Sequence, residues 1–222
     1  MTDPLLFCIA EEAKPLVYQV MNTEMYVPGP QMEAQRNVFW LVETHDPPTP
    51  EWPGTERDSP DHEGQRLRQQ LNKDEPFKAE WIGASEEDCE AWAMDMQYRV
   101  NYIEQDHIVI LDAQSARDGT VLVKEYVHAL ELDPDDEEPA FSIKEVNTWH
   151  NFRMEPQYVL AFNTDLTYGL ATTAEPVYYG LKKELTDAHG IFDYKKAKRI
   201  VLGEEPGYDI QKLIASFRPK SQ

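Results

Sequence analysis

The sequence has few cysteines, and this shortage excludes some kinds of site. Two occur among the 222 residues, Cys8 and Cys89. Two thiols are too few for a cysteine-rich zinc centre. Cys8 falls in an apolar stretch and Cys89 in a helical pattern, so we expect two reduced, buried side chains rather than a disulfide.

Cationic side chains are also scarce. The chain carries 21 Lys and Arg against 41 Asp and Glu, which gives a formal net charge of −20 at pH 7. Nucleic acids and anionic lipids are bound by clustered cations, so this balance argues against a nucleic-acid or membrane partner. A protein partner would instead be basic. The acidity lies mainly before residue 141, because residues 141–222 hold 11 cations and 10 acids.

Long hydrophobic runs are missing as well. No segment approaches the roughly 18 consecutive apolar residues that a membrane-spanning helix needs. The stretch from Met1 to Lys14 contains a short apolar run, but no cationic region precedes that run as it would in a signal peptide. We therefore expect a cytoplasmic protein.

Recognisable catalytic motifs are absent too. The sequence contains no Gly-x-Ser-x-Gly, His-Glu-x-x-His or Gly-x-Gly-x-x-Gly pattern. These patterns are typical of a nucleophile elbow, a zinc-binding helix and a dinucleotide-binding loop, respectively. We expect neither a metal ion nor another cofactor.

Apolar residues are nevertheless plentiful enough for a folded core, at 41% hydrophobic and 11% aromatic. Residues 5–10 and 37–44 predict strands, because they are rich in β-branched, aliphatic and aromatic side chains. Residues 77–82 predict a weaker strand. Several prolines between residues 44 and 60 disfavour a helix or a central strand there.

This pattern leads to an expected division of the chain. We predict that residues 1–45 belong to the single domain and that residues 46–76 form a proline-rich acidic linker with a short helix. Residues 77–222 are expected to form the main domain. An acidic gap at residues 133–139 is read as a solvent-exposed loop between two strands, because adjacent like charges favour hydration.

The clearest local pattern is a pair of apolar runs, His107–Asp112 and Thr120–Val127. The connector Ala113–Gly119 is too short for a parallel crossover, so we predict an antiparallel hairpin. Val146–Met154 predicts a further strand.

Helical patterns flank these strands. Apolar side chains at spacings of three and four predict helices over residues 85–100, 156–168 and 176–189, and a short one over residues 208–217. We therefore predict an α+β fold: a mixed, largely antiparallel sheet of about five or six strands, covered by helices.

The order of these elements carries a resemblance. The helix from Ser85, the strand Ile108–Asp112, the connector Ser115–Thr120 and the segment Phe152–Pro156 together resemble a small α/β family of unknown function found in bacteria and fungi. The resemblance covers about residues 77–194. That family has no established activity, so it implies a fold and no function.

Four polar residues are candidates for acid–base chemistry: His107, Asp112, His128 and His150. Each borders an apolar strand, where a pocket could shift its pKa toward neutrality. The alternative is that acids and histidines end strands simply because water is present there. If the protein is an enzyme, these residues would form its catalytic site.

A second candidate group is Trp149, Asn151 and Arg153. Alternation along a strand places these three side chains on one face and His150, Phe152 and Met154 on the other. Aromatic and hydrogen-bonding groups together are typical of ligand pockets and interfaces. The same pattern also fits plain packing with a surface arginine. The basic stretch from Lys195 to Arg199 could bind an acidic partner or the protein's own acidic loop, or it could simply be hydrated.

The function that the sequence favours is a non-catalytic, acidic intracellular binding or accessory module with a basic protein partner. The alternative is a small-molecule enzyme that performs a tailoring or accessory step, with a His/Asp acid–base site at strand ends. A third hypothesis is mimicry of nucleic acid by ordered surface carboxylates.

Overall fold

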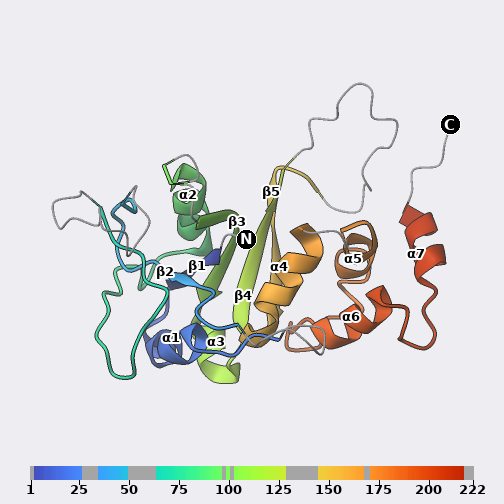
Figure 1. The fold of residues 1–222 in the computed structure, drawn as a ribbon, viewed down its shortest axis with the longest axis horizontal. Helices are drawn as coiled ribbons and strands as arrows, with labels where there is room; N and C mark the ends of the chain where they lie inside the picture. Colours follow the sequence, from blue (N-terminus) through green and yellow to red (C-terminus); the bar gives the residue numbers. More distant parts are fainter. Residues whose placement is uncertain are drawn as a thin grey trace.

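The computed structural model describes residues 3–26, 35–49, 64–96, 99–100, 103–128, 145–167 and 171–217. Within these ranges, five strands form one mixed sheet in the order β2-β1-β3-β4-β5. Figure 1 shows this sheet with helices on both sides. The strands are β1 (Asp3–Cys8), β2 (Trp40–Leu41), β3 (Ile103–Leu111), β4 (Val121–Val127) and β5 (Thr148–Met154).

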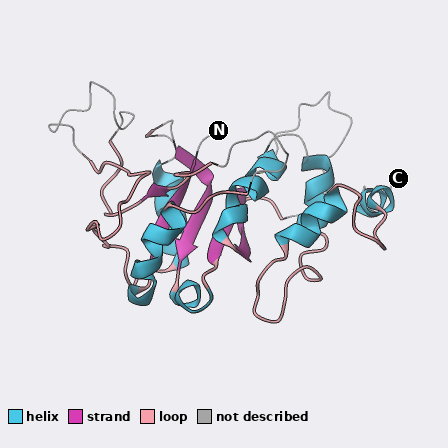
Figure 2. Ribbon diagram, turned by 60° about the horizontal axis from the view of Figure 1, so that its bottom comes forward, coloured by secondary structure: helices cyan, strands magenta, loops and turns pink. Residues whose placement is uncertain are grey.

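Helices flank the strands, as Figure 2 shows. None of those in the described ranges combines the length and apolar character needed to cross a bilayer. They are η1 (Glu11–Ala13), α1 (Lys14–Met21), α2 (Glu86–Met96), α3 (Ala113–Asp118), η2 (Pro156–Tyr158), α4 (Val159–Thr167), α5 (Ala171–Tyr178), α6 (Tyr194–Val201) and α7 (Ile210–Phe217).

The first half of the sheet is parallel. β1 pairs with β2 on one side and with β3 on the other, so the strand order reverses around β1. Parallel neighbours need crossover connections, and α1 and α2 lie in those two connections. The residues of α1 pack on one face of the sheet and those of α2 on the opposite face. This arrangement is half of a doubly wound fold.

The second half of the sheet is antiparallel. In the β3–β4 pair Val109 faces Val123, and in the β4–β5 pair Val123 faces Phe152. The predicted hairpin arms therefore lie side by side, and the predicted α+β class and number of strands are confirmed.

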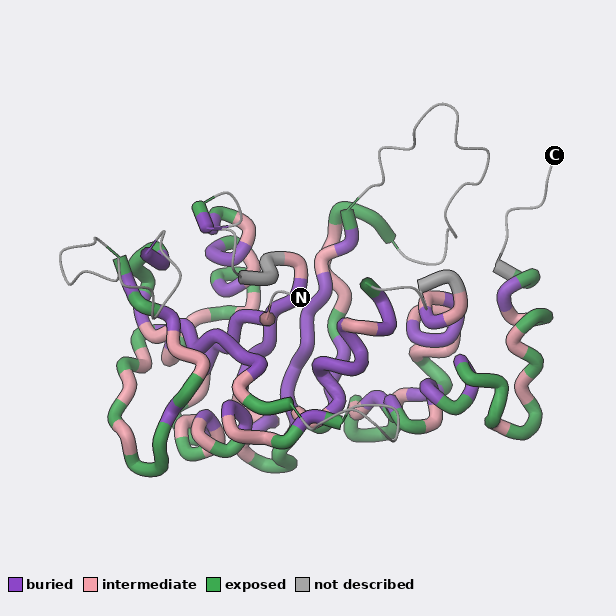
Figure 3. The backbone as a smooth tube through the Cα atoms, viewed as in Figure 1, coloured by how far each residue is buried: buried purple, intermediate pink, exposed green. Residues whose placement is uncertain are grey.

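Each face of the sheet covers a separate core, and Figure 3 shows the burial concentrated along the strands. The larger core joins alternate residues of the sheet to α1, α4, α5 and α6. The smaller core joins the other face to α2 through Cys89, Trp92, Ala93 and Met96. The period-two alternation of β1 explains this division, since Leu5 and Phe7 enter one core and Leu6 and Cys8 enter the other.

A buried polar cluster joins α4, α5 and α6. Asp165 accepts hydrogen bonds from the hydroxyls of Tyr178 (2.6 Å) and Tyr194 (2.9 Å). Lys198 Nζ lies 2.5 Å from the other carboxylate oxygen of Asp165. All four side chains are buried. Burial raises the pKa of both tyrosines, so both stay protonated donors to the carboxylate.

The connector between β3 and β4 differs from the sequence interpretation, because it forms the short helix α3 rather than a loop. Asp112 accepts a hydrogen bond from the Ser115 amide, and the Ser115 hydroxyl accepts one from the Asp112 amide. This reciprocal cap stabilises a helix of about one and a half turns, and the sequence of that helix has no apolar periodicity. Gly119 closes the helix with a φ of 74°, a conformation that glycine adopts without strain.

Three other predicted elements are corrected. Residues 77–82 form turns and irregular chain rather than a strand. Within the predicted strand 37–44, the residues of β2 are the ones that form a strand. The predicted helix 176–189 is wrong, because α5 ends at Tyr178 and turns follow. Pro176 lies inside α5, which begins five residues before it, at Ala171. The acidic gap 133–139 lies outside the described residues.

Candidate functional site

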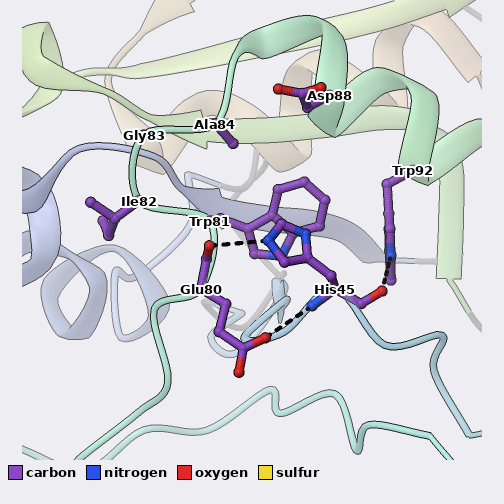
Figure 4. Close-up of a pocket in the computed structure, with 8 residues that line it drawn as sticks. All are labelled: His45, Glu80, Trp81, Ile82, Gly83, Ala84, Asp88 and Trp92. Atoms are coloured by element: carbon purple, nitrogen blue, oxygen red, sulfur yellow. Dashed lines mark hydrogen bonds between the residues drawn. The ribbon is translucent and has the colours of Figure 1, made fainter.

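A pocket of about 560 Å³ lies where the chain passes from the sheet into α2. Figure 4 shows its lining, which includes His45, Glu80, Trp81, Asp88 and Trp92. The backbone amide of Gly83 donates a 2.9 Å hydrogen bond to the Ile9 carbonyl, directly after β1. The pocket therefore lies near the carboxyl end of a central parallel strand, which is where open α/β sheets bind ligands.

Two buried indoles form the inner wall of the pocket. The Trp81 and Trp92 rings pack edge to face with their centroids 5.9 Å apart, and the Phe7 ring contacts both. Trp81 Nε1 donates to the Thr44 carbonyl at 3.0 Å, and Trp92 Nε1 donates to the His45 carbonyl at 3.1 Å. Because both N–H groups are satisfied by main chain, the orientation of the rings is fixed.

His45 forms the outer wall and is exposed. Its imidazole is 4.3 Å from the Trp81 ring, and Figure 4 shows the two rings together. Nε2 of His45 lies 3.1 Å from the Glu80 carbonyl oxygen. Because a carbonyl oxygen only accepts, Nε2 is the donor in this contact, and Nδ1 can accept a hydrogen bond when the ring is neutral.

The polar lining of the pocket is acidic. Asp88 Oδ2 accepts hydrogen bonds from the amide and the hydroxyl of Ser85, both at 2.9 Å. These bonds, the backbone one first, lower the pKa of Asp88, so its carboxylate is charged at neutral pH. Glu80 is exposed, and its Oε2 accepts a 3.4 Å hydrogen bond from the His45 amide. The lining residues that the structure describes include no lysine or arginine.

Helix α2 continues this acidic character, since its eleven residues contain five acids and no Lys or Arg. Two of them, Glu86 and Glu90, turn inward to the ammonium group of Lys124 on β4, which is buried. Glu87 and Asp88 remain at the surface. The helix therefore presents uncompensated carboxylates beside the pocket.

The predicted residues Asp112 and Arg153 meet, and both are used within the fold. Arg153 is buried, forms an ion pair with Asp112 and lies 3.3 Å from the Thr120 hydroxyl. Burial alone would raise the pKa of Asp112. The hydrogen bonds from the Ser115 amide and from Arg153 outweigh burial and lower it. Asp112 is thus a charged helix cap.

Two of the predicted histidines lie in one row across the sheet. His107 on β3 faces Glu125 on β4, and Glu125 faces His150 on β5. His107 Nε2 is 3.9 Å from Glu125 Oε1, and both side chains are buried. His150 Nε2 lies 2.8 Å from the Glu145 carbonyl oxygen, and its ring contacts Tyr179.

The other two predicted catalytic residues do not join this row. His128 is exposed, with Nε2 2.7 Å from Asp106 Oδ1. Asp112 lies five residues beyond His107, which is about 17 Å along an extended strand. The structure therefore separates the four predicted residues into at least two places.

Sequence reasoning placed neither Glu125 nor Lys182 among the candidate catalytic residues. Lys182 Nζ lies 4.4 Å from the centroid of the Phe152 ring, and burial lowers the pKa of Lys182, while the charge of Glu125 opposes that shift. The hairpin was predicted without its register. With the register known, the pairing of Glu125 with His107 would have been evident.

Trp149 and Asn151 share the face that alternation predicted. Trp149 faces Tyr126, with their rings 5.3 Å apart, and it packs against the core on the α2 side. Asn151 is exposed opposite Lys124. Their role in binding stays a prediction.

The basic stretch of α6 finds partners within the protein. Lys198 pairs with the buried Asp165, and Arg199 pairs with Glu205. Lys195 and Lys196 lie over the rings of Tyr158 and Tyr208. These intramolecular contacts account for the basic stretch without an external acidic partner.

The fold and the pocket together define an α+β protein with an acidic, aromatic-walled surface site. In the described part of the chain, no group of three or more His, Cys, Asp or Glu side chains could hold a metal ion. No family model, curated protein or solved structure matches the chain.

Proposed function

We propose that the protein is a non-catalytic binding or accessory module that recognises a basic protein partner through α2 and the pocket beside it. The observation that carries this proposal is the unequal placement of charge. Lys124, Arg153 and Lys198 are buried in ion pairs, while Glu87 and Asp88 face solvent.

This placement matters because net charge acts at long range. Three cations are used in these internal ion pairs, and the formal net charge of −20 gives the protein a negative field. Such a field attracts a cationic partner and raises its association rate, and it repels nucleic acid and anionic membranes. We place the protein in the cytoplasm, where Cys8 would stay reduced; burial raises the pKa of its thiol to about 11 and makes it unreactive.

The test is a titration with a synthetic octapeptide of alternating lysine and glycine, followed by NMR amide shifts at 50 mM and 300 mM salt. We expect shifts confined to the region of residues 80–88, with weaker binding at high salt because screening shortens the range of the field. Glu87→Lys should weaken binding more than Glu204→Lys, which makes the same charge change at an exposed site outside α2. Equal effects of the two variants, or no binding at 50 mM salt, would contradict the proposal.

A second candidate function is small-molecule acid–base catalysis, and the row His107, Glu125 and His150 favours it. Two imidazoles flanking a buried carboxylate are groups that can pass a proton. We expect incubation with a metabolite extract, followed by mass spectrometry, to reveal a compound consumed by the wild type and spared by Glu125→Gln. Thermal unfolding of that variant serves as the control for folding. An unchanged metabolite profile with the wild-type protein would eliminate this candidate.

A further inference from the structure

We propose that the pocket beside α2 receives a single cationic side chain, a lysine or an arginine, of the basic partner. This inference rests on the proposed function and adds the residues that perform the recognition. It makes Glu80, Asp88 and His45 the groups that contact the incoming cation.

Unused acceptors are the first support. Among the described residues, hydrogen bonds reach Oε2 of Glu80 and Oδ2 of Asp88, and none reaches the second oxygen of either carboxylate. Nδ1 of His45 is a further acceptor when the ring is neutral, since Nε2 donates to the Glu80 carbonyl. A lysine ammonium has three donors and an arginine guanidinium has five, and neither accepts, so this set of acceptors suits a cation.

The aromatic wall is the second support. Trp81 and Trp92 are buried and His45 lies against the Trp81 ring, so the two indoles offer an incoming side chain a packed apolar wall. Trp81 and Trp92 are held by their N–H bonds to main-chain carbonyls, so their positions are set before any ligand arrives. Preorganised side chains lose little entropy on binding. The apolar wall would contact the hydrocarbon stem of the lysine or arginine, while the rim carboxylates contact its charged end.

Size is the third support. A volume of about 560 Å³ lies within the range of small-ligand sites, so one long side chain fits inside the pocket. Gly83, with a φ of 85°, lines the pocket with bare backbone, and a Cβ added there would meet no atom within 4 Å. The access of a side chain to the pocket is therefore unobstructed at this position.

The experiment compares Glu80→Gln with Glu87→Gln. Both remove one exposed carboxylate of the same region, but only Glu80 lines the pocket. The probes are three octapeptides that alternate glycine with lysine, arginine or norleucine, and binding is followed by tryptophan fluorescence and calorimetry. Glu80→Gln should weaken the lysine or arginine peptide about tenfold or more, as loss of a hydrogen bond to a charged group does. Glu87→Gln should weaken it less than about fivefold.

Comparison of the three peptides shows whether the pocket prefers lysine or arginine and whether binding needs a positive charge. Whichever of the lysine and arginine peptides binds more tightly identifies the preferred side chain, and the norleucine peptide should not bind. Equal losses for Glu80→Gln and Glu87→Gln, or binding of the norleucine peptide, would overturn the pocket inference. If those results appear while Glu87→Lys still weakens binding, the proposed function stands without the pocket. Absence of binding by the wild type removes both.

Discussion

At the scale of single residues, this protein places titratable groups where burial changes their chemistry. Lys124, Asp165 and Arg153 each lose water and gain a partner of opposite charge. A buried ion is tolerated only when such a partner is present. Asp3 on β1 is different, because it is half-buried and receives a hydrogen bond from the neutral Gln69.

This difference predicts a pH effect. Burial raises the pKa of Asp3 to about 6, above its ordinary value of 3.8. The native state then binds more protons than the unfolded state between these values, so the contribution of Asp3 to stability falls as pH rises from about 4 through 6.

Asp3→Asn should therefore be more stable than the wild type at pH 7.5 and nearly equal to it at pH 4. After allowance for solvent screening of a half-buried group, we expect about 1 kcal/mol. Urea unfolding at both pH values measures this difference. Gln69→Ala removes a bond that lowers the pKa of Asp3, so it should move the pH dependence upward; an advantage of Asp3→Asn equal at both pH values would refute the assignment.

At the scale of elements, short polar contacts set the positions of helices that apolar patterns alone do not place. Helix α3 depends on its cap at Asp112, and α4, α5 and α6 meet at Asp165. Neither feature repeats along the sequence with a period. Sequence analysis therefore found the five strands and α2, whose periodicity is strong, but it added a strand at residues 77–82, misplaced α5 and missed α1, α3 and α6.

The Asp165 cluster yields a prediction. Lys198→Met leaves the carboxylate of Asp165 buried without a counter-ion, which should lower the free energy of unfolding by about 3 to 5 kcal/mol. Asp165→Leu combined with Lys198→Met removes both charges and should recover a substantial part of that loss. Chemical unfolding of the single and double variants forms the double-mutant cycle. A double variant as unstable as the sum of the single ones would mean that the pair is not coupled.

At the scale of the whole molecule, the sheet class was predictable and the site was not. Apolar runs at β1, β3 and β4 are strong local signals, and the short connector required the β3–β4 pair to be antiparallel. The pocket instead joins His45, Glu80 and Trp92, which come from three separate segments. These side chains come together because β1 and β2 pair in parallel, and no local sequence pattern predicts that pairing.

The position of β1 between β2 and β3 has a consequence for how the protein is made. Leu5 pairs with Ile108, so β1 leaves the ribosome long before its main neighbour. Until β3 follows, the strand available to β1 is the two-residue β2, and contacts between distant segments form slowly. The nascent chain must keep an apolar strand from aggregating while the residues between β1 and β3 are made, and this interval is when a chaperone would protect it.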